Sequence, residues 1–403
     1  MGIVVMKFGG SSVADADKIR AAARRAISTA KEGHQVVMVV SAMGDTTDDL
    51  VAMAKQLHDN PPKREMDQLL ATGEQVTISL VAMALESLGA PAISFTAGQI
   101  GIVTDDVHTK ARIKTIDVRR IHEQLRKGRI VIVAGFQGVT EDGAVTTLGR
   151  GGSNVTLVAI AAALKAEVCE NYTDVDGIYT REIDRISNDE MLELASLGAN
   201  VLHNRAVEFA KKYNVPIHVR SSLNTNKGTM IVAETQSMER ITVSGAALKD
   251  KLAGVTLQNV PDQPGAAARI FSTIAKSNIV VDDIIQTKTN GNTATMFFTV
   301  DLADFGDARK VIDKLCRELG CKAIYHENYA KVSAVGVGMR VHTGVADKMF
   351  SALAKAGINI HQITTSEIKI SCIISREQGK EALRLVHDAF ELGGKKKAAR
   401  KAK

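Results

Sequence analysis

The sequence is poor in the residues that cross-link or stiffen small proteins, with no tryptophan, four cysteines and six prolines among 403 residues. The cysteines are scattered, and the only close pair has four residues between its members. Because this spacing fits neither a disulfide scaffold nor a metal site, we interpret them as reduced thiols of a cytoplasmic protein. They are Cys169, Cys316, Cys321 and Cys372.

The chain also lacks the features of membrane and exported proteins. It has no run of about 18 apolar residues, so we expect no membrane partner. A basic segment, an apolar run and a cleavage site do not follow one another at the N-terminus, so we expect no export. An apolar content of 45% with 24% charged residues is typical of a globular protein.

Acidic residues are missing from the C-terminal end. The formal net charge is +6, and residues 395–403 hold six cations and no acid. We interpret residues 393–403 as a basic disordered tail, and the rest of the chain is then close to neutral. Nonspecific attraction to polyanions is the alternative, and we expect no specific nucleic-acid partner.

The length of the chain exceeds what one hydrophobic core usually supports, so we expect two or three domains. Up to about residue 230, short β-branched runs alternate with helical patterns. This alternation predicts an α/β domain whose mostly parallel sheet is covered by helices on both faces. The expected strands are 3–6, 36–40, 92–95, 130–134, 168–172 and 217–219, and the expected helices are 16–31, 64–88, 118–127, 154–164 and 188–197.

After residue 240, a smaller pattern of strand, helix and strand occurs twice, about 78 residues apart. Each copy continues as strand, strand and helix, which predicts two βαββαβ modules in tandem. Such modules either bind an effector at their interface or only hold subunits together. The repeated segments are 255–260, 266–276 and 278–281, then 332–337, 345–356 and 357–361, and the expected domains are 1–235, 250–328 and 329–392.

Two glycine loops in the first domain suggest a phosphate site. Residues 7–12 place Lys7 and two glycines directly after the first expected strand. Backbone N–H groups of glycines can approach an anion, and the lysine supplies a positive charge. A glycine pair after a strand is more often a tight turn, but a second glycine loop at residues 146–154 favours one triphosphate held between the two loops.

Six segments in this order resemble the aspartokinase family, in its monofunctional form with an amino-acid kinase domain and two ACT domains. The resemblance implies a three-layer αβα kinase fold followed by two ferredoxin-like modules. It also implies ATP-dependent phosphorylation of the L-aspartate β-carboxylate to 4-phospho-L-aspartate, the first step toward lysine, threonine and methionine. The matching segments are 7–12, 41–47, 72–74, 135–138, 147–153 and 172–177.

The resemblance also implies roles for individual residues. A carboxylate nucleophile is ionised at neutral pH, so the reaction needs charge neutralisation and no general base. From the residues alone, Glu74 could be a helix-end charge, and Asp45 or Thr47 could cap a helix. The implied set is Lys7 and Asn154 for catalysis; Lys7, Gly9, Gly10, Ser11, Gly151, Gly152, Ser153, Thr173, Asp174 and Tyr179 for ATP, which carries Mg²⁺; and Ser41, Thr47, Glu74 and Arg150 for aspartate.

The sequence departs from the family on the nucleotide side. Asn154 stands where the family has an aspartate, Asn200 stands where it has a lysine, and about ten residues are missing after Thr180. We expect either an aspartokinase with altered nucleotide handling, using Arg181 or Arg205, or a noncatalytic homologue that acts as a regulatory subunit. A third alternative is a kinase of the same fold that phosphorylates a different acyl acceptor.

For the ACT modules, the resemblance implies lysine or threonine as effector and a homo-oligomer formed through these modules. The implied effector residues lie at the start of each module's first helix and in the strand that follows it. They are Asp262, Gly265, Ala266, Ile279, Asp282, Gln286, Asn359 and Ile360, with Gly344, Val345 and Thr365 facing them.

Overall fold

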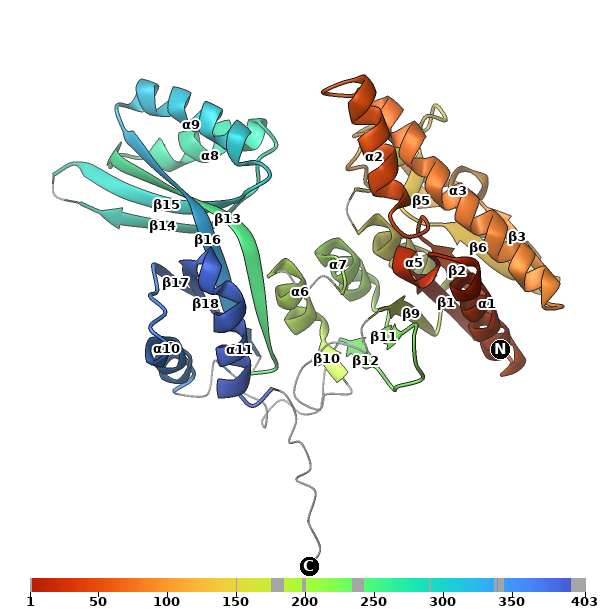
Figure 1. The fold of residues 1–403 in the computed structure, drawn as a ribbon. Coiled ribbons are helices and arrows are strands. Elements are labelled where there is room, and N and C mark those ends of the chain that lie inside the picture. The colour runs from red at the N-terminus through yellow and green to blue at the C-terminus, as the bar shows by residue number, and fades with distance from the viewer. Residues whose placement is uncertain are drawn as a thin grey trace, which may run out of the picture. The chain divides into compact units, whose positions relative to one another are not determined.

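The computed structural model describes residues 2–149, 151–174, 185–197, 201–233, 243–289, 291–336, 339 and 344–392. The chain divides into two compact units, Met1–Ser237 and Met238–Lys403 (Figure 1). No sheet and no hydrophobic core is shared between the two units among the described residues.

The first unit is built on an eight-stranded sheet with the strand order β10-β12-β11-β9-β1-β2-β6-β3. All neighbouring strands are parallel except β11 and β12. This confirms the predicted α/β class. The strands are β1 (Ile3–Phe8), β2 (Gln35–Val40), β3 (Ala92–Phe95), β6 (Ile130–Ala134), β9 (Val168–Thr173), β10 (Arg185–Ser187), β11 (Ile217–Ser221) and β12 (Thr229–Val232).

Helices cover both faces of this sheet, because its central strands are apolar on both sides. Val4, Met6 and Phe8 of β1 share one core with α1 and α3, while the alternate residue Val5 is also fully buried. Helix α5, which contacts β1, is buried along nearly its whole length. The helices are α1 (Ala16–Lys31), α2 (Thr46–Leu57), α3 (Lys63–Ser87), α4 (Arg119–Arg126), α5 (Gly152–Leu164), α6 (Asn188–Ser196) and α7 (Asn204–Tyr213).

A second sheet in this unit has the order β5-β4-β7-β8. Its strands have only three or four residues each, too few for a clear sequence pattern. Strand β8 leads into the second glycine loop, so this sheet helps to place the loop. The strands are β4 (Ile102–Thr104), β5 (Ile113–Ile116), β7 (Gln137–Val139) and β8 (Val145–Thr147).

The second unit has one antiparallel sheet of six strands with the order β14-β15-β13-β16-β18-β17. Helices α8 and α9 belong to one hydrophobic core, and α10 and α11 belong to another. The elements are β13 (Gly245–Pro261), α8 (Ala266–Lys276), β14 (Val281–Lys288), β15 (Thr293–Asp301), α9 (Phe305–Leu319), β16 (Lys322–Val335), α10 (Val345–Lys355), β17 (Gln362–Thr365), β18 (Lys369–Ser375) and α11 (Gly379–Ala389).

The repeat is present, but its modules share strands. Strand β13 pairs with β16 along most of its length, so both strands run through both modules. Leu248 of β13 packs in the core of α10 and α11, whereas Val255 lies in the core of α8 and α9. The proposed boundary between residues 328 and 329 therefore falls within β16.

The prediction of strands at residues 278–281 and 357–361 is wrong. Strand β14 begins only at Val281, and β17 begins only at Gln362. Asn278 and Gly357 have φ angles of 56° and 69°, so the chain turns in the left-handed region after each helix before a strand can form.

Candidate functional site

Lys7 lies near the carboxyl end of the central strand β1, where the first glycine loop begins. Its Nζ would lie 3.3 Å from a Cβ added to Gly9, so the ammonium lies against that loop. Burial lowers the pKa of Lys7 to about 8, although the nearby Asp174 carboxylate acts in the opposite direction. The side chain is therefore a half-buried cation placed against the loop, where its charge can meet an anion.

The loops after β1 and β2 are joined by backbone hydrogen bonds. The Gly44 N–H donates to the Gly10 carbonyl at 3.1 Å, and the Ser41 N–H donates to the Phe8 carbonyl at 3.1 Å. A Cβ on Gly10 would lie only 2.7 Å from the Ala42 carbonyl oxygen, so this close approach requires glycine. Ser11, in the same loop, is exposed.

Glu74 is a buried carboxylate in the middle of α3, with 2% of its surface exposed. Its Oε1 accepts a hydrogen bond from the Ala42 N–H at 3.0 Å, and its Oε2 has no hydrogen-bond partner among the described residues. Burial raises the pKa of Glu74 to about 7. The helix-end reading of Glu74 is wrong, because α3 runs from Lys63 to Ser87.

Ser41 connects this region to the start of α5. Its hydroxyl donates to the Ser153 Oγ at 3.0 Å, which joins the loop after β2 to the first turn of that helix. Thr47 is half-buried in the first turn of α2. Asp45 is at the N-cap position of α2 but makes no side-chain capping bond, so the structure does not support the capping alternative.

The second glycine loop ends at the N-terminus of α5. Gly151 is the N-cap with φ of 69°, and a Cβ there would collide with the His203 ring. Gly152 and Ser153 then begin the helix, so their N–H groups lie at its positive end. Asn154 is 8% exposed, and its Oδ1 has no hydrogen-bond partner among the described residues.

Asn171 is a site residue that the motif comparison did not identify. It is paired in register with Lys7 on the neighbouring strand β9, so both side chains are on the same face of the sheet. It is fully buried, its Nδ2 donates to the Val201 carbonyl at 3.1 Å, and its Oδ1 has no partner in the described part of the chain. Next to Asn171, the Thr173 hydroxyl donates to the Asp174 carboxylate at 3.0 Å.

Two charged side chains hold the second glycine loop in place. Asp67 on α3 is fully buried and accepts hydrogen bonds from the Thr147 hydroxyl at 2.5 Å and from the Thr109 N–H. His108 Nδ1 lies 2.7 Å from the same carboxylate. The Arg205 guanidinium donates to the Leu148 carbonyl at 2.6 Å and to the Ala111 carbonyl at 3.0 Å.

These contacts change the reading of Arg205, which the sequence analysis considered for nucleotide binding. The guanidinium is already bonded to backbone carbonyl groups, so it holds the loop in place. Arg150, Tyr179, Arg181 and Asn200 lie outside the described residues, so their roles stay predictions.

Most of the expected effector residues of the second unit either form ion pairs or lie at the surface. Asp262 forms a 3.3 Å ion pair with the exposed Lys288, whereas Asp282 lies 2.6 Å from the ammonium of Lys331, whose side chain is fully buried. Gly265 precedes α8 with φ of 93°. Gln286 and Asn359 are exposed, Ala266 and Ile360 are half-buried, and Ile279 and Val345 are buried.

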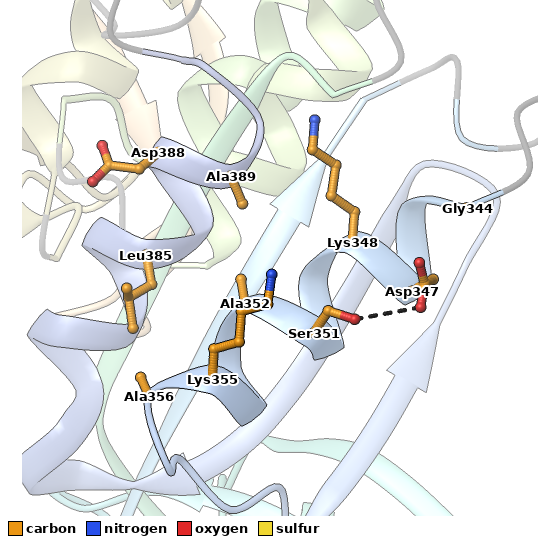
Figure 2. Close-up of a pocket in the computed structure, with 10 residues that line it drawn as sticks. All are labelled: Gly344, Asp347, Lys348, Ser351, Ala352, Lys355, Ala356, Leu385, Asp388 and Ala389. Atoms are coloured by element: carbon orange, nitrogen blue, oxygen red, sulfur yellow. Dashed lines mark hydrogen bonds between the residues drawn. The ribbon is translucent and has the colours of Figure 1, made fainter.

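The second unit also contains an open groove of about 820 Å³ between α10 and α11. Small side chains, Ala352, Ala356 and Ala389, leave space between the helices, and Lys348 and Lys355 stand at the rim (Figure 2). Ser351 donates to Asp347 at 3.4 Å. No glycine loop or buried carboxylate lines this groove, so it is distinct from the site of the first unit.

Comparison with known proteins agrees with this division. Residues 2–221 match the amino acid kinase family, and residues 255–319 and 332–390 each match an ACT domain. The first match covers more than half of the chain, so the protein belongs to the amino acid kinase family.

The relatives narrow the assignment. The chain is 50% identical to Aspartokinase 2 of Bacillus subtilis over 402 residues, which cover 97% of this chain and 98% of that protein. It is 48% identical to an aspartate kinase of Stutzerimonas stutzeri over 403 residues, with 97% and 98% covered. Within its family the chain is therefore an aspartokinase.

A solved structure has the same fold. Aspartokinase III of E. coli, in complex with aspartate and ADP in the R-state, matches with a TM-score of 0.82 at 25% identity. The match covers 96% of this chain and 99% of that one.

Proposed function

We propose that the protein transfers the γ-phosphoryl group of ATP to the β-carboxylate of L-aspartate and forms 4-phospho-L-aspartate. The observation that carries this proposal is Glu74, a buried carboxylate with one oxygen free to receive an ammonium group. A buried charge is stable only when it is paired, so the site is built to receive a cationic group. The likeness to an enzyme that binds aspartate and ADP supports this reading.

In the proposed complex, Glu74 receives the α-ammonium group of aspartate. Ser41 and Thr47 are assigned to the same substrate site, and Ser153, on the ATP side, is joined to Ser41 by a hydrogen bond between their hydroxyl groups. Arg150 pairs with the substrate α-carboxylate, a task that suits its planar guanidinium group. The free β-carboxylate then points toward the glycine loops and Lys7.

Phosphoryl transfer to this carboxylate requires positioning and charge neutralisation, because the nucleophile is already ionised. The two reactants are both anions and repel each other. The N–H groups of Gly9 and Gly152 already donate to the Tyr172 and Gly149 carbonyls, at 3.4 Å and 2.9 Å. The Lys7 ammonium and the N–H groups of Gly10 and Gly151 therefore stabilise the charge on the transferred phosphoryl group. The first glycine loop is fixed before ATP binds by its hydrogen bonds to the loop after β2, and the second is fixed by Asp67 and Arg205.

The residues present fit a magnesium nucleotide. Glycine at positions 10 and 152 is required by packing, since an added Cβ would lie 2.7 Å from the Ala42 carbonyl oxygen and 2.8 Å from the Phe136 ring. The groups that can meet phosphate oxygens are the Lys7 ammonium and the positive end of α5. The described residues contain no group of three or more His, Cys, Asp or Glu that could hold a metal ion. We therefore assign Mg²⁺ to the ATP phosphates, where it screens their charge, with Thr173 and Asp174 at the nucleotide side.

The test uses the reaction product. An acyl phosphate reacts with hydroxylamine, so the full-length protein with ATP, Mg²⁺ and aspartate should produce aspartyl hydroxamate. Glu74→Gln should lower kcat/KM for aspartate at least a hundredfold, because it removes the charge that binds the ammonium. Exposed Glu86 in the same helix offers a matched control as Glu86→Gln. If aspartate binds in calorimetry but no hydroxamate forms, the noncatalytic reading replaces this one.

The ACT modules support a regulatory proposal. The N-terminus of α8, opened by Gly265, offers N–H donors to the carboxylate of an amino-acid effector such as lysine or threonine. Asp262 is the better acceptor for the effector ammonium than Asp282, because its present partner Lys288 is exposed and easily displaced. A lysine complex is known for E. coli aspartokinase III.

We also propose that the protein forms homo-oligomers through its ACT modules. Apolar side chains are exposed near the two edge strands of the second unit, at Val280, Ile284 and Ile363. Light scattering after size exclusion tests this directly, and Ile284→Lys should weaken the assembly.

We place the protein in the cytoplasm. Among the described residues, α3 alone has the length and hydropathy of a membrane span, but it carries Asp67 and Glu74 and packs into the core. The pattern is therefore that of a core helix.

A further inference from the structure

Two cysteines of the second unit, Cys316 and Cys321, meet at the end of α9. The helix ends at Leu319, and Gly320 follows with φ of 69°. The N–H groups of Gly320 and Cys321 both donate to the carbonyl of Cys316, the latter at 3.1 Å. This is a Schellman-type helix end, in which the residue after the left-handed glycine folds back onto the last turn.

The fold-back brings the two thiols together. Their Sγ atoms are 2.9 Å apart, and a disulfide bond requires about 2.05 Å. Helix ends of this type usually place two hydrophobic side chains at these positions, so the backbone motif alone fixes the proximity. The structural alternative is that the thiols serve only as this apolar contact.

The two thiols differ in access. Cys316 is 6% exposed and lies in the core with Ile312 and Leu315, whereas Cys321 is partly exposed. Burial, together with the hydrogen bond from the Cys321 thiol, raises the pKa of Cys316 to about 12. Cys321 is therefore the thiol that meets an oxidant first, and Cys316 is the one that resolves the product.

We propose that Cys316 and Cys321 form a reversible redox modification site, at which hydrogen peroxide converts the two thiols to a disulfide. The Cys321 thiolate attacks one peroxide oxygen, the O–O bond breaks, and the departing hydroxide takes up a proton and leaves as water. The sulfur of Cys316 then attacks the resulting sulfenic acid, and its proton leaves with the hydroxyl group as a second water. Two thiols and one peroxide thus give one disulfide and two waters.

The bond would fasten the last turn of α9 to the residue that directly precedes β16. A helix end frays because its last carbonyl groups have no helical partner, and a covalent link across this end prevents that opening. The oxidised protein should therefore exchange the amide hydrogens of residues 317–321 at least tenfold more slowly than the reduced protein.

The experiment treats the full-length protein with hydrogen peroxide, blocks free thiols and digests with trypsin. Because trypsin cuts after Lys314, Arg317 and Lys322, the disulfide should join peptides 315–317 and 318–322, and dithiothreitol should separate them. Buried Cys169 and Cys372 should stay reduced and serve as internal controls. Cys372→Ser should not affect the linked peptides.

Two variants separate the steps. In the Cys316→Ser variant, the reaction should stop at a sulfenic acid on Cys321, which dimedone traps. In the Cys321→Ser variant, Cys316 should stay reduced. Accumulation of Cys321 sulfinic acid beside a reduced Cys316 in the parent protein would overturn the proposal. Disulfides found only between two chains would overturn it as well.

Discussion

At the scale of residues, two side chains of the site have pKa values that burial moves toward neutrality from opposite directions. Burial raises the pKa of Glu74 to about 7 and lowers the pKa of Lys7 to about 8. Glu74 must be ionised to bind an ammonium group, and this form is lost as the pH falls below 7. Lys7 must be protonated to face phosphate, and this form is lost as the pH rises above 8.

We therefore expect kcat/KM to be highest between about pH 7 and pH 8. It should fall on either side, toward a tenfold loss per pH unit, because kcat/KM reports the pKa values of the free enzyme. The measurement is a pH profile at low substrate concentration. A profile that stays flat from pH 6 to pH 9 would contradict the assignment of both residues.

A second prediction concerns Asn154, which has no charge to balance Lys7 or magnesium. Asn154→Asp should raise kcat at least tenfold, equivalent to about 1.4 kcal/mol of transition-state stabilisation. Asn188 is a matched control, since it is also buried and its Oδ1 also lacks a hydrogen-bond partner in the described part of the chain, but it lies in α6. Equal rates for the parent and Asn154→Asp in steady-state assays would show that this position does not limit the reaction.

Local motifs reveal some of these residues and not others. Lys7 and Glu74 could be predicted because each belongs to a short motif. Asn171 could not, since its place beside Lys7 depends on β9 pairing with β1, more than 150 residues away in the sequence. Asp67 was missed because a lone acid in a helical pattern has no sequence signal for burial.

At the scale of elements, the hydrophobic pattern was sufficient to predict a strand where the strand is long and apolar on both faces. The expected strands at 92–95 and 130–134 have the bounds of β3 and β6. The pattern was insufficient for the three- and four-residue strands of the second sheet, and it did not predict α2 or α7. The formation of these short strands and of α2 and α7 depends on tertiary packing and on hydrogen bonds between distant segments, such as those of Asp67.

Asp67 provides the prediction at this scale. Asp67→Asn keeps the shape of the side chain but removes charge-assisted hydrogen bonds to Thr147 and Thr109, so it should lower the free energy of unfolding by about 1–3 kcal/mol. Asp117, which is paired with Arg119 at the surface, is the control, and Asp117→Asn should change the free energy of unfolding much less than Asp67→Asn does. Urea denaturation measures both. Equal losses for the two variants would contradict a special role for Asp67.

At the scale of the whole molecule, the second unit is held by a buried charge cluster as well as by its two cores. The Lys331 ammonium lies 2.6 Å from Asp282 and 2.8 Å from Asp283, and Asp283 also accepts a hydrogen bond from Thr364 of β17. The cluster thus joins β14, β16 and β17. An effector that displaced Lys331 from Asp282 would leave the buried ammonium with one carboxylate partner in place of two, which is costly.

We therefore expect lysine or threonine to bind through Asp262. At a concentration of 100 times Kd, either ligand should add about 2.7 kcal/mol and raise the melting temperature by several degrees. Asp262→Asn should abolish this shift in a thermal scan of the full chain, while the control Lys288→Ala should retain it. No shift with lysine, threonine or methionine would leave the modules with a purely structural role.

The strands shared by the two ACT modules have a consequence for cutting the molecule apart. Residues 245–249 of β13 pair with residues 331–335 of β16. The outer strand of the second module is therefore supplied by residues that precede the first module in the sequence. A fragment of residues 329–392 would expose the bare edge of β16, and unpaired edges recruit strands from other chains. Removing residues 245–249 would thus leave the second module with an unpaired strand edge, so the two modules form one folding unit.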